Sequence, residues 1–260
     1  MKFYLKWKII LLIISAVALV VVLYLQGPIP QSPLYHHFAD ERGFLNIPNF
    51  FNVISNIFFL YVGLYGLIKL LTPGWRKQIY FAEKNGVIFY IIFFFGIFLI
   101  GIGSSYYHWN PHNSTLVWDR LSMNIALMSL LAAMFNERIN PITGWIALPI
   151  LLIIGIFSVL YWYHTELVGQ GDLRFYIFTQ TYPALAVLIL LCFPTVYTKT
   201  SWLWTALILY ILARVFEIFD FYVYDGTRTL TSGHSLKHVT AAIASYCVWC
   251  YLSLRTIKRV

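Results

Sequence analysis

Residues 86–107 read GVIFYIIFFFGIFLIGIGSSYY, a stretch without a single charged side chain. A transmembrane helix needs roughly 20 mostly apolar residues, which this stretch supplies. The whole chain agrees, because 60% of its 260 residues are hydrophobic and 11% are charged, whereas a soluble domain carries about 25% charged residues. We therefore expect an integral membrane protein rather than a soluble enzyme, a disordered chain or a nucleic-acid-binding protein.

Seven further apolar runs lie on either side of this stretch and predict an all-α, polytopic transmembrane helical bundle. Polar segments such as Thr72-Pro73-Gly74 separate the runs. We expect a core of seven helices within residues 31–260 and one extra N-terminal helix within residues 1–30. The eight predicted spans are residues 8–25, 50–72, 86–107, 116–135, 143–163, 181–197, 201–219 and 236–254.

The first run follows a basic start and could in principle be a cleaved signal peptide. Its apolar stretch is longer than a usual signal core, and residues 26–30, QGPIP, contain no small-x-small cleavage motif. We therefore expect an uncleaved first helix that resembles a signal anchor.

The placement of lysine and arginine predicts the orientation of the bundle. With the N terminus in the cytoplasm, eleven basic residues fall in inner segments and three in outer loops. Cytoplasmic loops of membrane proteins carry such an excess, so we expect both termini in the cytoplasm. This bias also accounts for the formal net charge of +8. The inner residues are Lys2, Lys6, Lys8, Arg76, Lys77, Lys84, Arg138, Lys199, Arg255, Lys258 and Arg259, and the outer residues are Arg42, Arg174 and Arg228.

Three histidines are predicted to lie at the outer end of the bundle. His108 follows the third run, while His234 and His238 lie four positions apart, on one face of a helix, near the start of the eighth. Ionisable residues in membrane helices are costly and therefore candidates for function. Three imidazoles with one open position form a catalytic zinc site, so we expect Zn²⁺ here. The same spacing could hold haem, although two axial histidines usually come from opposing helices.

Polar residues at the same level would complete a hydrolytic site. Ser104, one helical turn before His108, could donate a hydrogen bond to an oxyanion on a substrate carbonyl. Asp119, which opens the fourth run beside Arg120, could accept a proton from a water on the ion or orient a ligand histidine. We therefore predict Ser104 and Asp119 as catalytic residues.

These motifs together resemble the alkaline ceramidase family, part of a membrane hydrolase superfamily that also includes adiponectin-receptor-like and GPI-remodelling proteins. Besides the spacing of the histidines, three segments carry the resemblance, which covers roughly residues 35–255. They are residues 52–56, NVISN, residues 103–108, GSSYYH, and residues 171–176, GDLRFY.

The resemblance implies a zinc-dependent membrane amidase that cuts the N-acyl bond of a ceramide-like lipid into a sphingoid base and a fatty acid. Carried over to this chain, the motif implies His108, His234 and His238 as zinc ligands. Asp119 corresponds to the residue that activates water, and Ser104 to the residue that stabilises the oxyanion. The expected partner is thus a membrane lipid substrate reached at the extracytoplasmic face.

Animal ceramidases of this family bind calcium through an acidic cluster ahead of the first core helix. That cluster includes a glutamate three residues before the asparagine that matches Asn52, and Asn49 stands there in this chain. Because Ca²⁺ takes several charged oxygen ligands, we do not expect an intact calcium site. A degraded site would use Asp40, Glu41 and Asn49.

Two other functions stay open, and one of them is a membrane haem protein. A non-catalytic receptor or binding protein of the same superfamily would hold the metal and sense a lipid without consuming it. Transport is less favoured, because the chain has neither paired repeats nor broken helices in matching halves. The sequence predicts no particular oligomeric state.

The remaining polar and aromatic residues are interpreted structurally. Arg214 and Glu217, three positions apart in the seventh run, are expected to form a buried ion pair, and Asp220 could approach the metal ligands. Three cysteines in apolar runs are expected to be small core residues: Cys192, Cys247 and Cys250. Four aromatic residues are expected at the membrane interface: Tyr106, Tyr107, Trp118 and Tyr222. Four histidines are expected in outer loops: His36, His37, His112 and His164.

Overall fold

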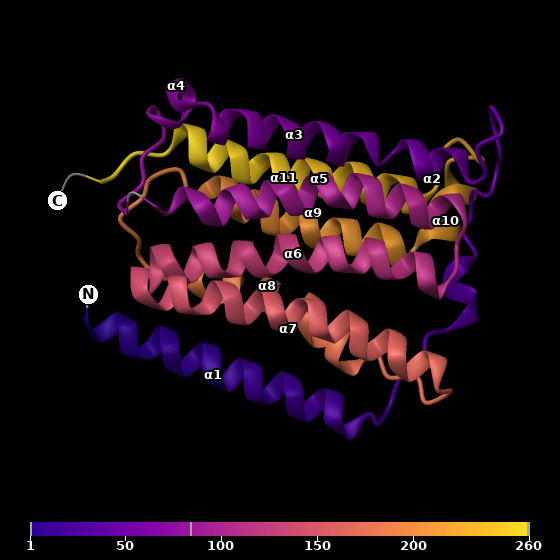
Figure 1. Ribbon diagram of the computed structural model, residues 1–260, viewed down its shortest axis with the longest axis horizontal. Coiled ribbons are helices and arrows are strands. Elements are labelled where there is room, and N and C mark those ends of the chain that lie inside the picture. Colours follow the sequence, from indigo (N-terminus) through magenta and orange to yellow (C-terminus); the bar gives the residue numbers. More distant parts are fainter. Residues whose placement is uncertain (1, 84, 259–260) are drawn as a thin grey trace.

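Long helices running side by side make up the protein (Figure 1). The computed structural model describes residues 2–83 and 85–258, so Lys84 and Arg259 lie outside the described residues. Within the described part there is no β-strand. The elements are α1 (Lys2–Leu25), the 3₁₀ helix η1 (Pro33–His36), α2 (Phe50–Ile54), α3 (Ile57–Leu71), α4 (Pro73–Arg76), α5 (Val87–Trp109), α6 (Asn113–Arg138), α7 (Pro141–Leu167), α8 (Arg174–Leu191), α9 (Ser201–Ile218), α10 (Asp220–Gly226) and α11 (Gly233–Leu254).

Seven helical spans in the described residues are long and apolar enough to cross a membrane, with α2 and α3 together forming one of them. The eighth predicted span, residues 236–254, lies in α11, which is 22 residues long but is not one of these seven. α11 packs along α9 and α3. The prediction of a multi-pass, all-α membrane protein is confirmed. The extra N-terminal helix α1 lies at the edge of the bundle and packs against α8 (Figure 1).

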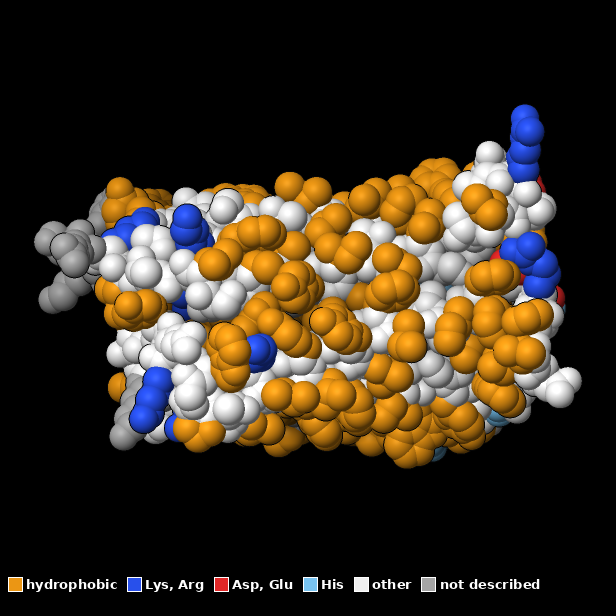
Figure 2. Space-filling model, turned by 90° about the horizontal axis from the view of Figure 1, so that it is seen from above, with side chains coloured by type: hydrophobic (Ala, Val, Ile, Leu, Met, Phe, Trp, Pro, Cys, Tyr) orange, Lys and Arg blue, Asp and Glu red, His pale blue; other side chains and the backbone are white. Residues whose placement is uncertain are grey.

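The surface of the bundle matches a bilayer in its distribution of side chains. In Figure 2, hydrophobic side chains cover the middle of the visible face, and most lysine and arginine side chains lie toward its two ends. Both chain termini lie at one of these ends, and α2 and α10 lie at the other (Figure 1). We call these the terminal end and the α10 end of the bundle.

The sixth span differs from its prediction. We expected residues 181–197, but α8 spans Arg174–Leu191. Its first half contains polar side chains that bond inside the bundle, as where Gln180 Nε2 donates to Asn124 Oδ1 at 2.7 Å. Hydropathy alone therefore missed this half, because the polar side chains there find partners within the protein rather than in water.

Arg174, which was expected in a loop, is the first residue of α8 and forms a salt bridge with Asp172. Arg174 donates to Asp172 through Nε at 2.9 Å and Nη2 at 2.8 Å, and its backbone N–H donates to the same carboxylate. These hydrogen bonds from Arg174 lower the pKa of the Asp172 carboxyl. Because its charge is paired with Asp172, Arg174 can be the first residue of a membrane helix.

Two smaller predictions are wrong. His164 lies inside α7, because that helix continues to Leu167 rather than ending with its apolar run at residue 163. Cys192 is exposed, because α8 ends at Leu191 and leaves Cys192 outside the packed interior. Cys247, by contrast, is buried in α11, as expected.

Candidate metal centre

The end of α5 and the starts of α6 and α11 meet at the α10 end of the bundle, where the candidate site residues lie. α5 ends at Trp109, before the helix-breaking Pro111, and α6 begins at Asn113. α11 begins at Gly233, where a Cβ would lie 2.3 Å from the Phe216 carbonyl oxygen, so this glycine permits close packing of α11 on α9. His108 on α5 and the two histidines of α11 therefore lie together at the α10 end of the bundle.

The three predicted histidines face one another. Ligand atoms from His108, His234 and His238 all lie within 4.8 Å of one another, and all three side chains are buried. The Nε2 atoms of His108 and His234 are 3.2 Å apart. The ring centroids are separated by 4.7 Å (His108–His234), 5.0 Å (His108–His238) and 4.9 Å (His234–His238). We call this group the histidine triad.

The triad fits a tetrahedral metal ion. Two nitrogens bound to zinc at about 2.0–2.1 Å with tetrahedral angles lie about 3.3 Å apart, close to the 3.2 Å between His108 Nε2 and His234 Nε2. Neutral imidazole is also a common zinc ligand. Since the ring centroids are only 4.7–5.0 Å apart, a porphyrin has no space between any two of these rings. The triad could hold a metal ion, and a haem held between two of its histidines does not fit.

Neighbouring groups orient two of the triad residues. Ser55 Oγ lies 2.8 Å from Nδ1 of His238, which leaves the other ring nitrogen for a metal. The Asp220 carboxylate accepts from the His234 backbone N–H at 2.7 Å, so the predicted approach of Asp220 to the triad is observed. His108 Nδ1, by contrast, has no hydrogen-bond partner among the described residues.

An aromatic cover closes the triad. The Phe38 ring packs edge-on against His108 and His234, with centroid distances of 4.7 and 4.8 Å. Behind it lies Tyr107, which is 1% exposed and whose hydroxyl is 3.0 Å from Nδ1 of His36. Tyr107 is therefore a buried residue and not the interfacial one we expected. Burial also lowers the pKa of His36.

The other three aromatic residues of that predicted set are exposed. Tyr106 is 52% exposed, Trp118 58% and Tyr222 77%. These exposures fit the predicted interfacial belt. His36 also differs from our expectation, because it ends the η1 helix and its ring contacts Tyr107 and Asn113 instead of standing apart in a loop.

Ser104 and Asp119 lie next to the triad on adjacent helices. A Cβ on Gly103 would lie 2.6 Å from the Trp118 carbonyl oxygen, so this glycine allows α5 and α6 to touch. That contact brings the Ser104 hydroxyl to the Asp119 carboxylate, with which it interacts. Both side chains are buried and line the same cavity as His238.

The predicted ion pair between Arg214 and Glu217 is present, but it is not buried as expected, because the Arg214 side chain is 52% exposed. The pair is also part of a larger network. Glu217 also accepts a hydrogen bond from Lys237 at 2.8 Å and from the Tyr35 hydroxyl at 3.3 Å. Lys237 Nζ lies 3.4 Å from Nε2 of His234. Lys237 was not among the predicted site residues, although its position on one helix between His234 and His238 indicated that it lies near the metal ligands.

Ser55 was also missed as a triad contact. Asn52, Ser55 and Asn56 recur at helical spacing inside an apolar run, which predicts one polar face. In the structure Ser55 and Asn56 form the turn that separates α2 from α3, and both are buried. This polar face was the available signal.

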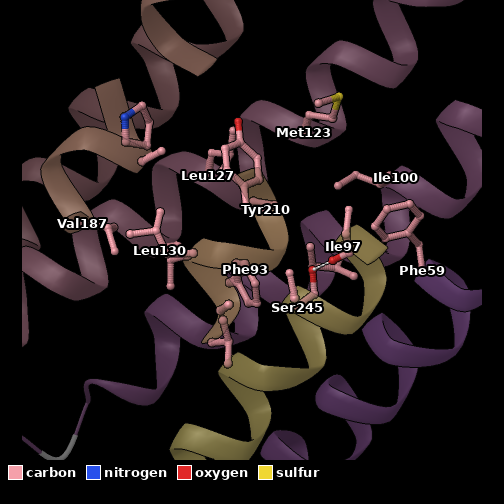
Figure 3. Close-up of a pocket in the computed structure, with 18 of the residues that line it drawn as sticks. Phe59, Phe93, Ile97, Ile100, Met123, Leu127, Leu130, Val187, Tyr210 and Ser245 are labelled. Carbon is pink, nitrogen blue, oxygen red and sulfur yellow. Dashed lines mark hydrogen bonds between the residues drawn. The ribbon is translucent and has the colours of Figure 1, made fainter. Parts of the chain in front are cut away.

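An apolar cavity of about 150 Å³ extends from the triad into the bundle. Figure 3 shows side chains from α3, α5, α6, α8, α9 and α11 pointing into it, among them Phe59, Ile97, Leu130, Val187 and Tyr210. Ser104, Asp119, Lys237 and His238 lie at its polar end, and Met134 lines it fifteen positions from Asp119 on α6. That separation is about 22 Å of helix, so the cavity is elongated along the bundle.

The residues of the degraded calcium site have other partners. Both oxygens of Asp40 accept from Arg42, at 2.8 and 2.7 Å, and Asn49 Nδ2 donates to the His108 carbonyl oxygen at 2.9 Å. A Glu41 oxygen accepts from the Phe38 backbone N–H at 3.2 Å. A calcium ion here would have to displace Arg42 from Asp40.

Fold and centre together define a multi-pass membrane protein with a buried histidine triad that could hold a metal ion, beside an elongated apolar cavity. The chain belongs to the ceramidase family, because the family model described as Ceramidase matches residues 45–259. The membership implies a hydrolase of the ceramidase type. Comparison with curated proteins finds no match.

Proposed function

We propose that the protein is a zinc-dependent membrane amidase that hydrolyses the N-acyl bond of a ceramide-like lipid, releasing a sphingoid base and a fatty acid. One observation carries the proposal: Ser104, Asp119 and the triad residue His238 line the polar end of an elongated apolar cavity, and the other two triad histidines lie against His238. Such a cavity suits an acyl chain whose carbonyl stops at the triad. Membership of the ceramidase family supports the same chemistry.

The triad residues would hold the ion, and the neighbouring side chains would do the rest. Zinc bound by three imidazoles supplies a Lewis acid that polarises a carbonyl and lowers the pKa of a coordinated water toward about 7. Asp119 would take a proton from the attacking water and deliver it to the leaving amine nitrogen. Ser104 would donate a hydrogen bond to the carbonyl oxygen as it gains negative charge. The water thus adds across the C–N bond, giving an acid and an amine.

The orientation and the division of the chain belong to the same proposal. Both termini lie at the terminal end and the triad lies at the α10 end, as an N-in arrangement with an outward-facing active site requires (Figure 1). We also propose that residues 1–30 form a separate anchoring helix before a hydrolase domain of residues 31–260. The position of α1 at the edge of the bundle, ahead of the matched residues 45–259, supports this division.

Replacing the proposed proton acceptor tests the function. Purified protein is incubated with ceramides, and the released sphingoid base and fatty acid are measured by mass spectrometry. The variant Asp119→Asn should hydrolyse ceramide about 10²–10⁴-fold more slowly, because a positioned general base typically contributes that much. Its zinc content, measured by elemental analysis, should stay at the level of the unmodified protein.

Asp225→Asn is the matched control, because it makes the same chemical change on an exposed carboxylate of α10. It should retain full activity. If Asp119→Asn hydrolyses ceramide at the unmodified rate, the mechanism is wrong. If zinc is bound stoichiometrically but no lipid is consumed, the metal-containing receptor is the better description.

A further inference from the structure

A second cavity, of about 380 Å³, adjoins the apolar cavity beside Asp119 and Lys237. Asp119, Met123 and Lys237 line both spaces, so a lipid bound at the triad has access to each. The second cavity also contacts Gln31, Arg120 and Arg214, and we call it the polar cavity. If the acyl chain occupies the apolar cavity, the polar cavity is the space left for the amine portion of the substrate.

Arg120 lines the polar cavity with unused hydrogen-bonding capacity. It is only 3% exposed, and its Nη2 donates to Gln31 Oε1 at 2.6 Å. Its Nε and Nη1, however, have no hydrogen-bond partner, and no carboxylate forms an ion pair with it within the described part of the chain. Buried polar groups are almost always satisfied. Arg138 also has two donors without a partner, but it lines neither cavity, whereas Arg120 lines the polar cavity, where a ligand can reach it.

Aromatic rings hold the Arg120 guanidinium in place. Its central carbon lies 3.9 Å from the centroid of the Trp162 ring, 4.4 Å from that of Tyr176 and 5.5 Å from that of Tyr35. Cation–π contacts of this kind stabilise the charge but accept no hydrogen bond in the plane of the guanidinium. The cation is therefore positioned in advance, with donors still available.

The lining of the polar cavity carries an excess of positive charge. Arg214 and Lys237 both contact the single carboxylate of Glu217. Asp119 interacts with Ser104 on the side of the apolar cavity. With Arg120, three cationic side chains face two anionic ones, so an anion would complete the balance.

We propose that the polar cavity is a subsite for an acidic group of a lipid, a carboxylate or a phosphate, held by the guanidinium of Arg120. A planar guanidinium with two free donors suits such oxyanions, which accept paired hydrogen bonds. The inference rests on the proposed function and narrows its substrate class to acidic N-acyl lipids. The same chemistry has a second source, the carboxylate of the released fatty acid.

Direct binding tests the subsite without any need for turnover. The probes are dodecyl phosphate and dodecanol, which share one alkyl chain, and their affinities for the full-length protein are measured by calorimetry in a neutral detergent. We expect the phosphate to bind about ten- to a hundredfold more tightly than the alcohol, as charge-assisted hydrogen bonds allow.

Gln31→Glu is the most informative variant, because it keeps Arg120 and places a carboxylate where Gln31 Oε1 already accepts from it. This internal anion should abolish the preference for the phosphate, as should Arg120→Gln. Arg138→Gln is the matched control: Arg138 lies on the same helix and is equally buried, but it lines neither cavity and donates to carbonyl oxygens at the terminal end. The control should keep the preference.

Hydrolysis distinguishes the two sources of the anion. N-dodecanoyl ceramide and its 1-phosphate are compared as substrates, and dodecanoate is tested as an inhibitor. If the substrate supplies the anion, Gln31→Glu raises KM for the phosphate alone; if the product supplies it, Gln31→Glu weakens inhibition by dodecanoate with either substrate. Equal binding of dodecyl phosphate and dodecanol, or a preference that survives Gln31→Glu, overturns the subsite. If no lipid is hydrolysed while the binding preference holds, the proposed function fails and the subsite stands.

Discussion

Two buried polar clusters lie at opposite ends of helix α6, and they differ in how completely their members satisfy one another. Asp119 belongs to the cluster at the α10 end, and Glu137 belongs to a cluster at the terminal end. Eighteen positions of helix separate them, about 27 Å. Both ends bury charge inside a membrane protein, which is costly in either place.

The cluster at the terminal end pairs its opposite charges, although Arg255 Nη2 has no hydrogen-bond partner among the described residues. Glu137 accepts hydrogen bonds from the Tyr90 hydroxyl at 2.8 Å, the Tyr251 hydroxyl at 2.8 Å and Arg255 Nη1 at 2.6 Å. Arg255 also donates to the Tyr80 carbonyl oxygen at 3.0 Å. None of these residues lines either cavity. The charges of Glu137 and Arg255 balance each other, so this cluster braces the bundle.

The cluster at the α10 end is open. His108 Nδ1 and two donors of Arg120 lack partners among the described residues, the triad rings face one another, and two cavities adjoin them. Polar groups that the protein does not satisfy itself are available for a metal ion or a substrate. Burial of charge thus does not identify function here; incomplete satisfaction beside a cavity does.

Removal of a triad ligand is the most direct test of the difference between the two clusters. His108→Ala should reduce zinc content to background and abolish hydrolysis, because two imidazoles remain where three are needed. The fold should persist, since His108 makes no side-chain ion pair. Elemental analysis and thermal unfolding in detergent measure the two properties on the same sample.

The exposed His164 of α7 supplies the control for the triad variant. His164→Ala should bind zinc and hydrolyse lipid as the unmodified protein does. Retention of stoichiometric zinc by His108→Ala would show that this residue is not a ligand.

A change in the cluster at the terminal end should lower stability and leave zinc binding and hydrolysis unchanged. Glu137→Gln leaves the Arg255 guanidinium buried without its counter-charge, and loss of one partner of such a pair costs about 3–5 kcal/mol of unfolding free energy. Zinc content and the rate per folded molecule should not change. Unfolding in detergent measures the first effect, and unaltered stability or a loss of zinc would remove the distinction between the two clusters.

The smallest expected effect concerns the orientation of the triad. Ser55→Ala removes the contact with His238 Nδ1 and should weaken zinc binding about 10–100-fold, as loss of such a supporting hydrogen bond usually does. Competition with a chelator measures the affinity. Ser105→Ala is the matched control on α5, because its hydroxyl bonds to backbone carbonyls and not to a histidine. Equal zinc affinities in the two variants would show that Ser55 does not support the metal ligand His238.

The spans that were predicted well are those in which hydropathy and helix length agree. The stretch 86–107 became α5, Val87–Trp109, and the run 201–219 became α9, Ser201–Ile218. The span at 181–197 was misplaced because Gln180 is polar in sequence and bonded to Asn124 in the fold. A hydropathy scale assigns a polar residue the same cost whether or not it is paired. In a membrane, however, the main cost falls on polar groups that have no hydrogen-bond partner.

The histidine pattern predicted which side chains to examine, because four-residue spacing places His234 and His238 on one face of a helix. It could not predict Ser55 or Phe38 as their neighbours. These two residues come from other parts of the chain, and no local spacing relates them to the triad.

By itself, the sequence determined the membrane class, most of the helices and the residue types of the centre, because these follow from apolar run length and from helical periodicity along one chain. Only the tertiary structure decided which buried charges are matched and which are left free. Arg120 and Arg255 look alike in sequence, yet Arg255, which follows α11, pairs with Glu137 of α6, whereas Arg120 lines a cavity. Pairing is a property of distances between helices, and those distances exist only after the helices have packed.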